Sequence, residues 1–72
     1  MSMKYAVVVE KGPDSFGAYA PDLPGCSVVG ETSEEALQLI REAIELHLQS
    51  LKEQGARIPE PVSSIEFMDV AA

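Results

Sequence analysis

The sequence predicts an α+β domain with the element order β-β-β-α-β. Three observations support this prediction: short apolar segments separated by glycine and proline in the first 30 residues, one long amphipathic segment with capping residues at both ends, and an alternating segment near the C-terminus. A strand that returns after a helical crossover lies parallel to its partner, and such crossovers are right-handed. We therefore expect an antiparallel three-stranded meander, a parallel fourth strand beside the first, and one helix packed on one sheet face.

The first three strands are expected before residue 31. Residues 4–10 are rich in Val and Tyr, which favour a pleated strand. A Gly-Pro-Asp turn within residues 11–15 leads to a second short strand over residues 16–20. Two prolines and a glycine then interrupt the ladder over residues 21–25, and residues 26–30 form the third strand.

The helix is expected over residues 32–54. Thr32 is a suitable N-cap, and Glu35 three residues later completes a capping box. Gly55 occupies the position of a left-handed residue after the last turn. Helical periodicity collects the apolar face, which consists of Ala36, Leu37, Ile40, Ala43, Ile44, His47, Leu48 and Leu51. The fourth strand is expected over residues 64–70, where Ile65, Phe67 and Asp69 alternate with Glu66 and Met68.

One helix covers only one face of such a sheet, yet the first strand is apolar on both faces. On the uncovered face we expect Ala6, Val8, Tyr19 and Val29. A chain of 72 residues has a marginal core of its own, which favours association into a homodimer or a larger homo-oligomer through these residues. A modest exposed patch of the kind found on any small protein is the alternative.

Length and charge exclude several classes of protein. The chain is expected to be a single domain over residues 3–70, with residues 1–2 as a cloning remnant or a disordered start. With 12 Asp and Glu against 5 Lys and Arg, its net charge of −7 disfavours direct binding of nucleic acid or an anionic membrane. The one cysteine makes no intrachain disulfide, and no apolar run reaches the length of a membrane span or a signal core. A cytoplasmic protein is expected.

The sequence offers little for catalysis. His47 lies in the apolar helical face, and a dyad with Cys26 is less favoured than a core histidine, because nothing cationic lies near Cys26 in the sequence. A Mg²⁺-dependent nuclease would need converging acids, and Asp14 and Glu66 are not forced to converge. No cofactor motif or metal-ligand cluster is present in the sequence. We expect no enzyme, no catalytic residue, no cofactor and no metal.

The most charged feature is the exposed face of the helix, which carries Glu34, Glu42, Glu45 and Glu53. Such a row of acids is suited to docking a basic protein, where opposite charge raises association rate and specificity. An ordinary solvated helix face carries the same residues, and both interpretations stay open.

Several segments, taken in order, resemble one family. They are Met3-Lys4-Tyr5 before a Val-rich strand, Asp22-Leu23-Pro24-Gly25-Cys26 in the loop, Thr32 and Glu35 at the helix cap, His47 within the helix, and Gly55 after it. Over residues 3–70 the chain closely resembles the HicB-like antitoxin family.

The resemblance implies a partial ribonuclease H-like domain that lacks catalytic residues. It also implies a partner, a basic HicA-type mRNA interferase, whose active site the antitoxin blocks. Members of full length add a C-terminal DNA-binding module, and we expect this chain to be a short form without one. An orphan oligomeric scaffold without a toxin is the alternative function, and a Mg²⁺-dependent ribonuclease H-like nuclease is the third.

Overall fold

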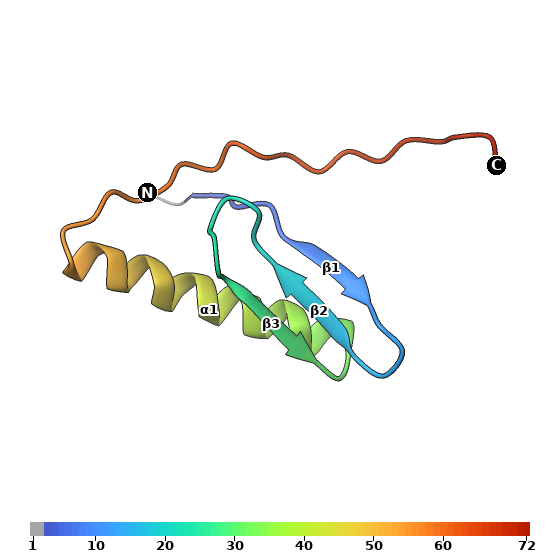
Figure 1. Cartoon of the computed structure of the whole chain (residues 1–72), viewed down its shortest axis with the longest axis horizontal. Coiled ribbons are helices and arrows are strands. Elements are labelled where there is room, and N and C mark those ends of the chain that lie inside the picture. The colour runs from blue at the N-terminus through green and yellow to red at the C-terminus, as the bar shows by residue number, and fades with distance from the viewer. Residues whose placement is uncertain (1–2) are drawn as a thin grey trace.

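A computed structural model describes residues 3–72, and the expectation for residues 1–2 lies outside the described residues. Three short strands precede one long helix (Figure 1): β1 (Val8–Lys11), β2 (Phe16–Tyr19), β3 (Ser27–Gly30) and α1 (Ser33–Glu53). The strands form one antiparallel sheet in the order β1-β2-β3. The predicted α+β class, with a three-stranded meander and one helix, is confirmed. In the described part of the chain no helix combines the length and apolar content needed to cross a membrane.

The register assigns the two faces of the sheet. Ala18 of β2 lies opposite Val9 on one side and Val28 on the other, and Ala18 and Val28 pack against the core beneath α1. Tyr19 lies opposite Val8, and side chains of neighbouring residues point to opposite faces. Val8 and Tyr19 therefore share the face that α1 leaves uncovered.

The first strand begins later than predicted. The ladder with β2 starts at Val8, whereas residues 3–7 are not assigned to a strand. Continuing the register would place Pro21 opposite Ala6, and proline has no N–H to donate to a ladder. The loop also turns there, because the Leu23 N–H donates to the Ala20 carbonyl at 3.0 Å and the Cys26 N–H donates to the Leu23 carbonyl at 3.1 Å.

The helix begins and ends as its capping residues predict. Thr32 Oγ1 accepts a hydrogen bond from the Glu35 N–H at 3.0 Å, and Glu35 Oε1 accepts one from the Glu31 N–H at 2.9 Å. At the other end Gly55 adopts a positive φ of 69°, and its N–H donates to the Lys52 carbonyl at 3.1 Å. The Ala56 N–H donates to the Leu51 carbonyl at 2.9 Å, which completes a Schellman motif.

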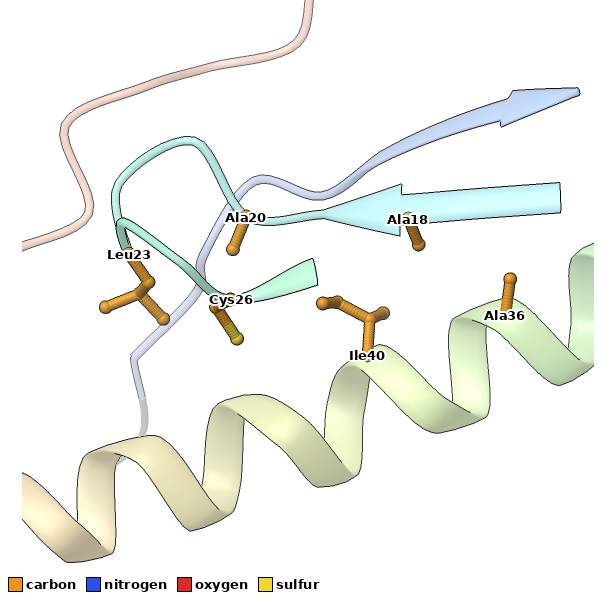
Figure 2. Packing of buried hydrophobic residues seen from close by; sticks show 6 residues of the cluster. All are labelled: Ala18, Ala20, Leu23, Cys26, Ala36 and Ile40. Atoms are coloured by element: carbon orange, nitrogen blue, oxygen red, sulfur yellow. The ribbon is translucent and has the colours of Figure 1, made fainter. Parts of the chain in front are cut away.

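The core lies between the sheet and α1 and is small. Its buried members are Ala18, Ala20, Leu23, Cys26, Ala36 and Ile40. Figure 2 shows those from the sheet and its loop on one side, with Ile40 and Ala36 of α1 on the other. Helix and sheet approach closely at Gly30, where a Cβ would lie only 2.8 Å from the Ala36 backbone nitrogen.

The predicted fourth strand does not form in this chain on its own. Residues 56–72 are assigned to no helix or strand, and they run as an extended segment toward the far end of the molecule (Figure 1). Phe67 is 94% exposed and Met68 is 82% exposed. The prediction of a fourth strand parallel to β1 is therefore not confirmed, because this segment makes no ladder with β1.

Candidate functional site

The acidic helix face is one candidate interaction surface. All four predicted glutamates (Glu34, Glu42, Glu45 and Glu53) belong to α1 and are exposed. At about 100° per residue their Cα positions fall within roughly a 100° sector of the helix. Ala36 and Ile40 on the opposite side are buried against the sheet. The fold therefore presents these carboxylates together, away from the core.

The uncovered sheet face is a second candidate. Val8 and Tyr19 are cross-strand neighbours on it, and Tyr19 is 39% exposed. Val29 is paired with Gly17, whose lack of a side chain leaves Val29 68% exposed. Ala6 lies before β1 and is half-buried. The structure thus gives Tyr19 and Val29 accessible apolar surface on the side away from α1.

An open groove of about 980 Å³ runs between residues 3–7 and α1. Its lining is mostly apolar side chains with a cationic rim: Met3, Lys4, Tyr5, Val7, Leu37, Gln38, Ile40, Arg41, Ile44, Glu45, Leu48, Lys52 and Ile58. Leu37 is 49% exposed there although it belongs to the apolar helical face. Three of the chain's 5 basic residues, Lys4, Arg41 and Lys52, gather around this groove.

Sequence reasoning missed the groove. It exists because residues 3–7 leave the β2 ladder and border α1 on their own, which depends on the position of Pro21 in the register. A usable signal was present on the helix, since Leu37, Arg41, Leu48 and Lys52 recur at helical spacing on one flank of the apolar face.

Asp22 of the loop between β2 and β3 holds the C-terminal segment. Its Oδ2 accepts hydrogen bonds from the Val62 N–H at 3.1 Å and the Ser63 N–H at 2.9 Å, and its Oδ1 accepts one from Ser63 Oγ at 2.7 Å. The bonds from Ser63, its backbone N–H first, lower the pKa of Asp22 below its ordinary value of 3.8. Asp22 is thus a charged anchor for a segment remote in the sequence.

Tyr5 makes a second attachment to the C-terminal segment. Its hydroxyl donates a hydrogen bond to the Pro59 carbonyl. Partial burial, followed by the negative charges of Asp22 and Glu60, raises the pKa of Tyr5 above 10.0. The tyrosine therefore stays protonated and able to donate at neutral pH.

The other residues of the resemblance have structural positions. Leu23 and Cys26 are core residues, Gly25 adopts a positive φ of 82° in the loop, and Pro24 is exposed beside it. His47 is half-buried on α1. Thr32, Glu35 and Gly55 cap the helix as described above.

The residues considered for catalysis are not assembled. Burial raises the pKa of the Cys26 thiol above 9.0, which opposes the thiolate that a nucleophile needs. Asp14 is exposed in the turn before β2, and Glu66 accepts a hydrogen bond from Ser64 Oγ at 3.3 Å within the C-terminal segment. Within residues 3–72 no three His, Cys, Asp or Glu side chains are grouped so that they could hold a metal ion.

Comparison with known families shows what the chain as a whole is similar to. A family described as the HicB-like antitoxin of bacterial toxin–antitoxin systems matches residues 5–71. The chain belongs to the HicB-like antitoxin family. This membership confirms the resemblance seen in the sequence and is that of a non-enzymatic class of protein.

Similar sequences and solved structures support this family membership. A UPF0150 protein of Thermoplasma acidophilum is 43% identical over 58 residues, which cover 79% of this chain and 84% of the relative. A solved HicA3 and HicB3 toxin–antitoxin complex contains a chain with a TM-score of 0.69 and 28% identity, over 83% of this chain and 70% of that one. The N-terminal domain of antitoxin HicB from Burkholderia pseudomallei has a TM-score of 0.64 and 32% identity, over 90% of this chain and 69% of that one.

Proposed function

We propose that this HicB-like protein is the antitoxin of a toxin–antitoxin pair. It acts as a non-catalytic module that neutralises a basic HicA-type mRNA interferase by occluding the toxin's active site. The single observation that carries this proposal is the family match over residues 5–71, and the likeness to a chain from a HicA–HicB complex supports it. The antitoxin acts in the cytoplasm, where mRNA is the toxin's substrate.

The proposed contact surface for the toxin is the acidic helix face of Glu34, Glu42, Glu45 and Glu53. An mRNA interferase must attract phosphates, so its working surface is cationic. The exposed carboxylates of α1, in a chain of net charge −7, are complementary to such a surface. An antitoxin docked through them competes directly with RNA for the same cations.

We further propose that the domain has a partial ribonuclease H-like fold and self-associates through the uncovered sheet face. The antiparallel meander with one helix supports the first point. The exposed apolar surface of Tyr19 and Val29, flanked by Val8 and Ala6, supports the second. Among residues 3–72 the largest fully buried side chains are Leu23 and Ile40, so the core is small and the monomer gains stability from any copy that covers this face.

The test is co-expression with a HicA-type protein, sought first among small basic proteins encoded beside this chain, followed by co-purification and an RNA-cleavage assay. We expect a stable complex and loss of cleavage. Glu42→Lys/Glu53→Lys should weaken inhibition at least tenfold, whereas Glu10→Lys/Asp14→Lys, with the same change in net charge at the β1–β2 hairpin, should leave it intact. Absence of a complex with any HicA-type protein refutes the antitoxin role and favours an orphan scaffold. Equal effects of the two variants refute only the helix face.

A further inference from the structure

We propose that the groove between residues 3–7 and α1 binds residues 64–70 of a second copy of this chain. In this arrangement two copies exchange their C-terminal segments, each lying as an added strand along the other's groove. The inference does not depend on the antitoxin role. It concerns a groove that shares Glu45 with the acidic helix face and that is separate from the uncovered sheet face.

The proposed occupant, residues 64–70, exposes several large apolar side chains. Four large apolar side chains fall within residues 64–70, and Phe67, Met68 and Val70 are 94%, 82% and 79% exposed. Ile65 is 47% exposed. Concentrating this much apolar surface in one extended segment is typical of a chain that binds elsewhere.

The groove matches this segment in chemistry. Its apolar lining, which includes Tyr5, Leu37 and Ile44, would cover apolar side chains on one side of an extended strand. Its lining holds three basic residues, Lys4, Arg41 and Lys52, against one acid, Glu45, in a chain that otherwise has an excess of acids. The incoming segment carries Glu66 and Asp69, so the net charges of groove and segment are opposite.

Length and backbone geometry agree with the match. Residues 64–70 span about 20 Å when extended, and the stretch of α1 from Leu37 to Lys52 is about 22 Å long. Residues 3–7 border the groove and lie outside the ladder that β1 makes with β2. Their backbone N–H and C=O groups are therefore suited to pair with an incoming strand.

A second copy, rather than the same chain, is the favoured donor. Ile58 lines the groove at the end of α1, and the Pro59 carbonyl is then held by Tyr5. Asp22 next holds Val62 and Ser63, and from there the chain extends away from the domain (Figure 1). The segment has left its own groove before residue 64. Two copies that each give and receive a segment form a closed two-fold dimer in which neither groove and neither segment is left unpaired.

Disulfide trapping tests both the site and the donor. Phe67→Cys combined with Glu45→Cys, in a Cys26→Ala background, joins the midpoint of the segment to the middle of the groove, so the pair meets in either strand direction. We expect mild oxidation to give a covalent dimer. The matched control replaces Glu45→Cys with Glu42→Cys, which lies on α1 but does not line the groove, and should give several-fold less dimer.

Each other result overturns a defined part of the proposal. If the disulfide forms only within one chain, the segment returns to its own groove, and exchange between copies is refuted. Equal trapping by the control, or no trapping at all, refutes the groove as the site.

A second measurement avoids dependence on crosslinking. Phe67→Ser removes an exposed side chain of the segment, and Leu37→Glu places a charge in the groove. Each substitution alone should raise the dissociation constant of the dimer at least tenfold, measured by sedimentation equilibrium. Mixing the two should restore association in part, because one intact segment still meets one intact groove. Circular dichroism of each variant checks that α1 is retained, and failure of the mixture to associate more strongly than either variant alone contradicts the exchange.

Discussion

Asp22 and Ser63 are 41 positions apart in the sequence and are joined by two hydrogen bonds, one from the Ser63 N–H at 2.9 Å and one from its hydroxyl at 2.7 Å. This contact ties the loop between β2 and β3 to the segment that follows α1. It decides where the exposed residues beyond position 63 leave the domain.

Removing the anchor should free the segment without unfolding the domain. Asp22→Ala deletes all three acceptor interactions, because both of its carboxylate oxygens are used. We expect amide hydrogen exchange at Val62 and Ser63 to become several-fold faster, while exchange within α1 is unchanged. Asp14→Ala, an exposed acid in the β1–β2 turn, is the control and should change neither. Unchanged exchange at Val62 and Ser63 in Asp22→Ala contradicts the anchoring role.

The same contact should respond to pH in one direction. The pKa of Asp22 is lowered by hydrogen bonds that its carboxylate accepts from Ser63 and Val62. At pH values above 3.8, the ordinary pKa of this side chain, these bonds therefore hold the C-terminal segment at full strength. Their contribution is lost as the pH falls through the lowered pKa. NMR of the Val62 and Ser63 amides should therefore show an anchored segment from neutral pH down to about 4 and release only in stronger acid. In Asp22→Asn this acid transition should be absent. Release of the segment near neutral pH in the unsubstituted protein would show that Asp22 does not control it.

Gly30 should resist substitution because of the close approach of β3 and α1. A Cβ at this position would lie 2.8 Å from the Ala36 nitrogen and 3.1 Å from the Ala36 Cα, both backbone atoms. Gly30→Ala should lower the free energy of unfolding by about 1–3 kcal/mol, measured by urea denaturation. Gly17→Ala is the matched control, since its Cβ would meet only the Val28 carbonyl oxygen at 3.8 Å. Comparable losses in both variants would show that steric contact with α1 is not the cause.

Ile40 is the largest of the buried side chains that α1 contributes to the core, at 1% exposure. Ile40→Val should reduce the free energy of unfolding by about 0.5–1.5 kcal/mol. Leu46→Val, at a site 68% exposed on the same helix, should change it by less than about 0.5 kcal/mol. Both are measured at one protein concentration, so that association contributes equally. A loss of stability in Leu46→Val equal to or larger than that in Ile40→Val would contradict the position of the core.

The helix was predictable because its determinants are local. Thr32, Glu35 and Gly55 act within a few residues of the ends they cap, and the apolar period lies within one segment. The start of the first strand was not, because it depends on where Pro21 falls opposite β1, which is a property of the register between strands. The amino-acid composition of residues 4–7 does not indicate that Pro21 would lie opposite them.

The interaction surfaces divide in the same way. The acidic helix face could be listed from helical spacing alone, and the structure presents those glutamates as exposed. The role of Asp22 was read only as part of a loop motif, since its partners Val62 and Ser63 are remote in sequence. The helical spacing of Leu37, Arg41, Leu48 and Lys52 indicates one wall of the groove, but the other wall depends on how residues 3–7 pass α1, which no local pattern predicts.

The exposed C-terminal segment also has sequence features that bear on fibre formation. A short stretch with Ile65, Phe67 and Val70 in extended backbone has the character of a segment that stacks with copies of itself into cross-β assemblies. Glu66 and Asp69 interrupt it, and in a stack of identical strands their like charges would lie directly above one another. These two acids therefore act as gatekeepers, because the repulsion between their like charges opposes stacking of the segment.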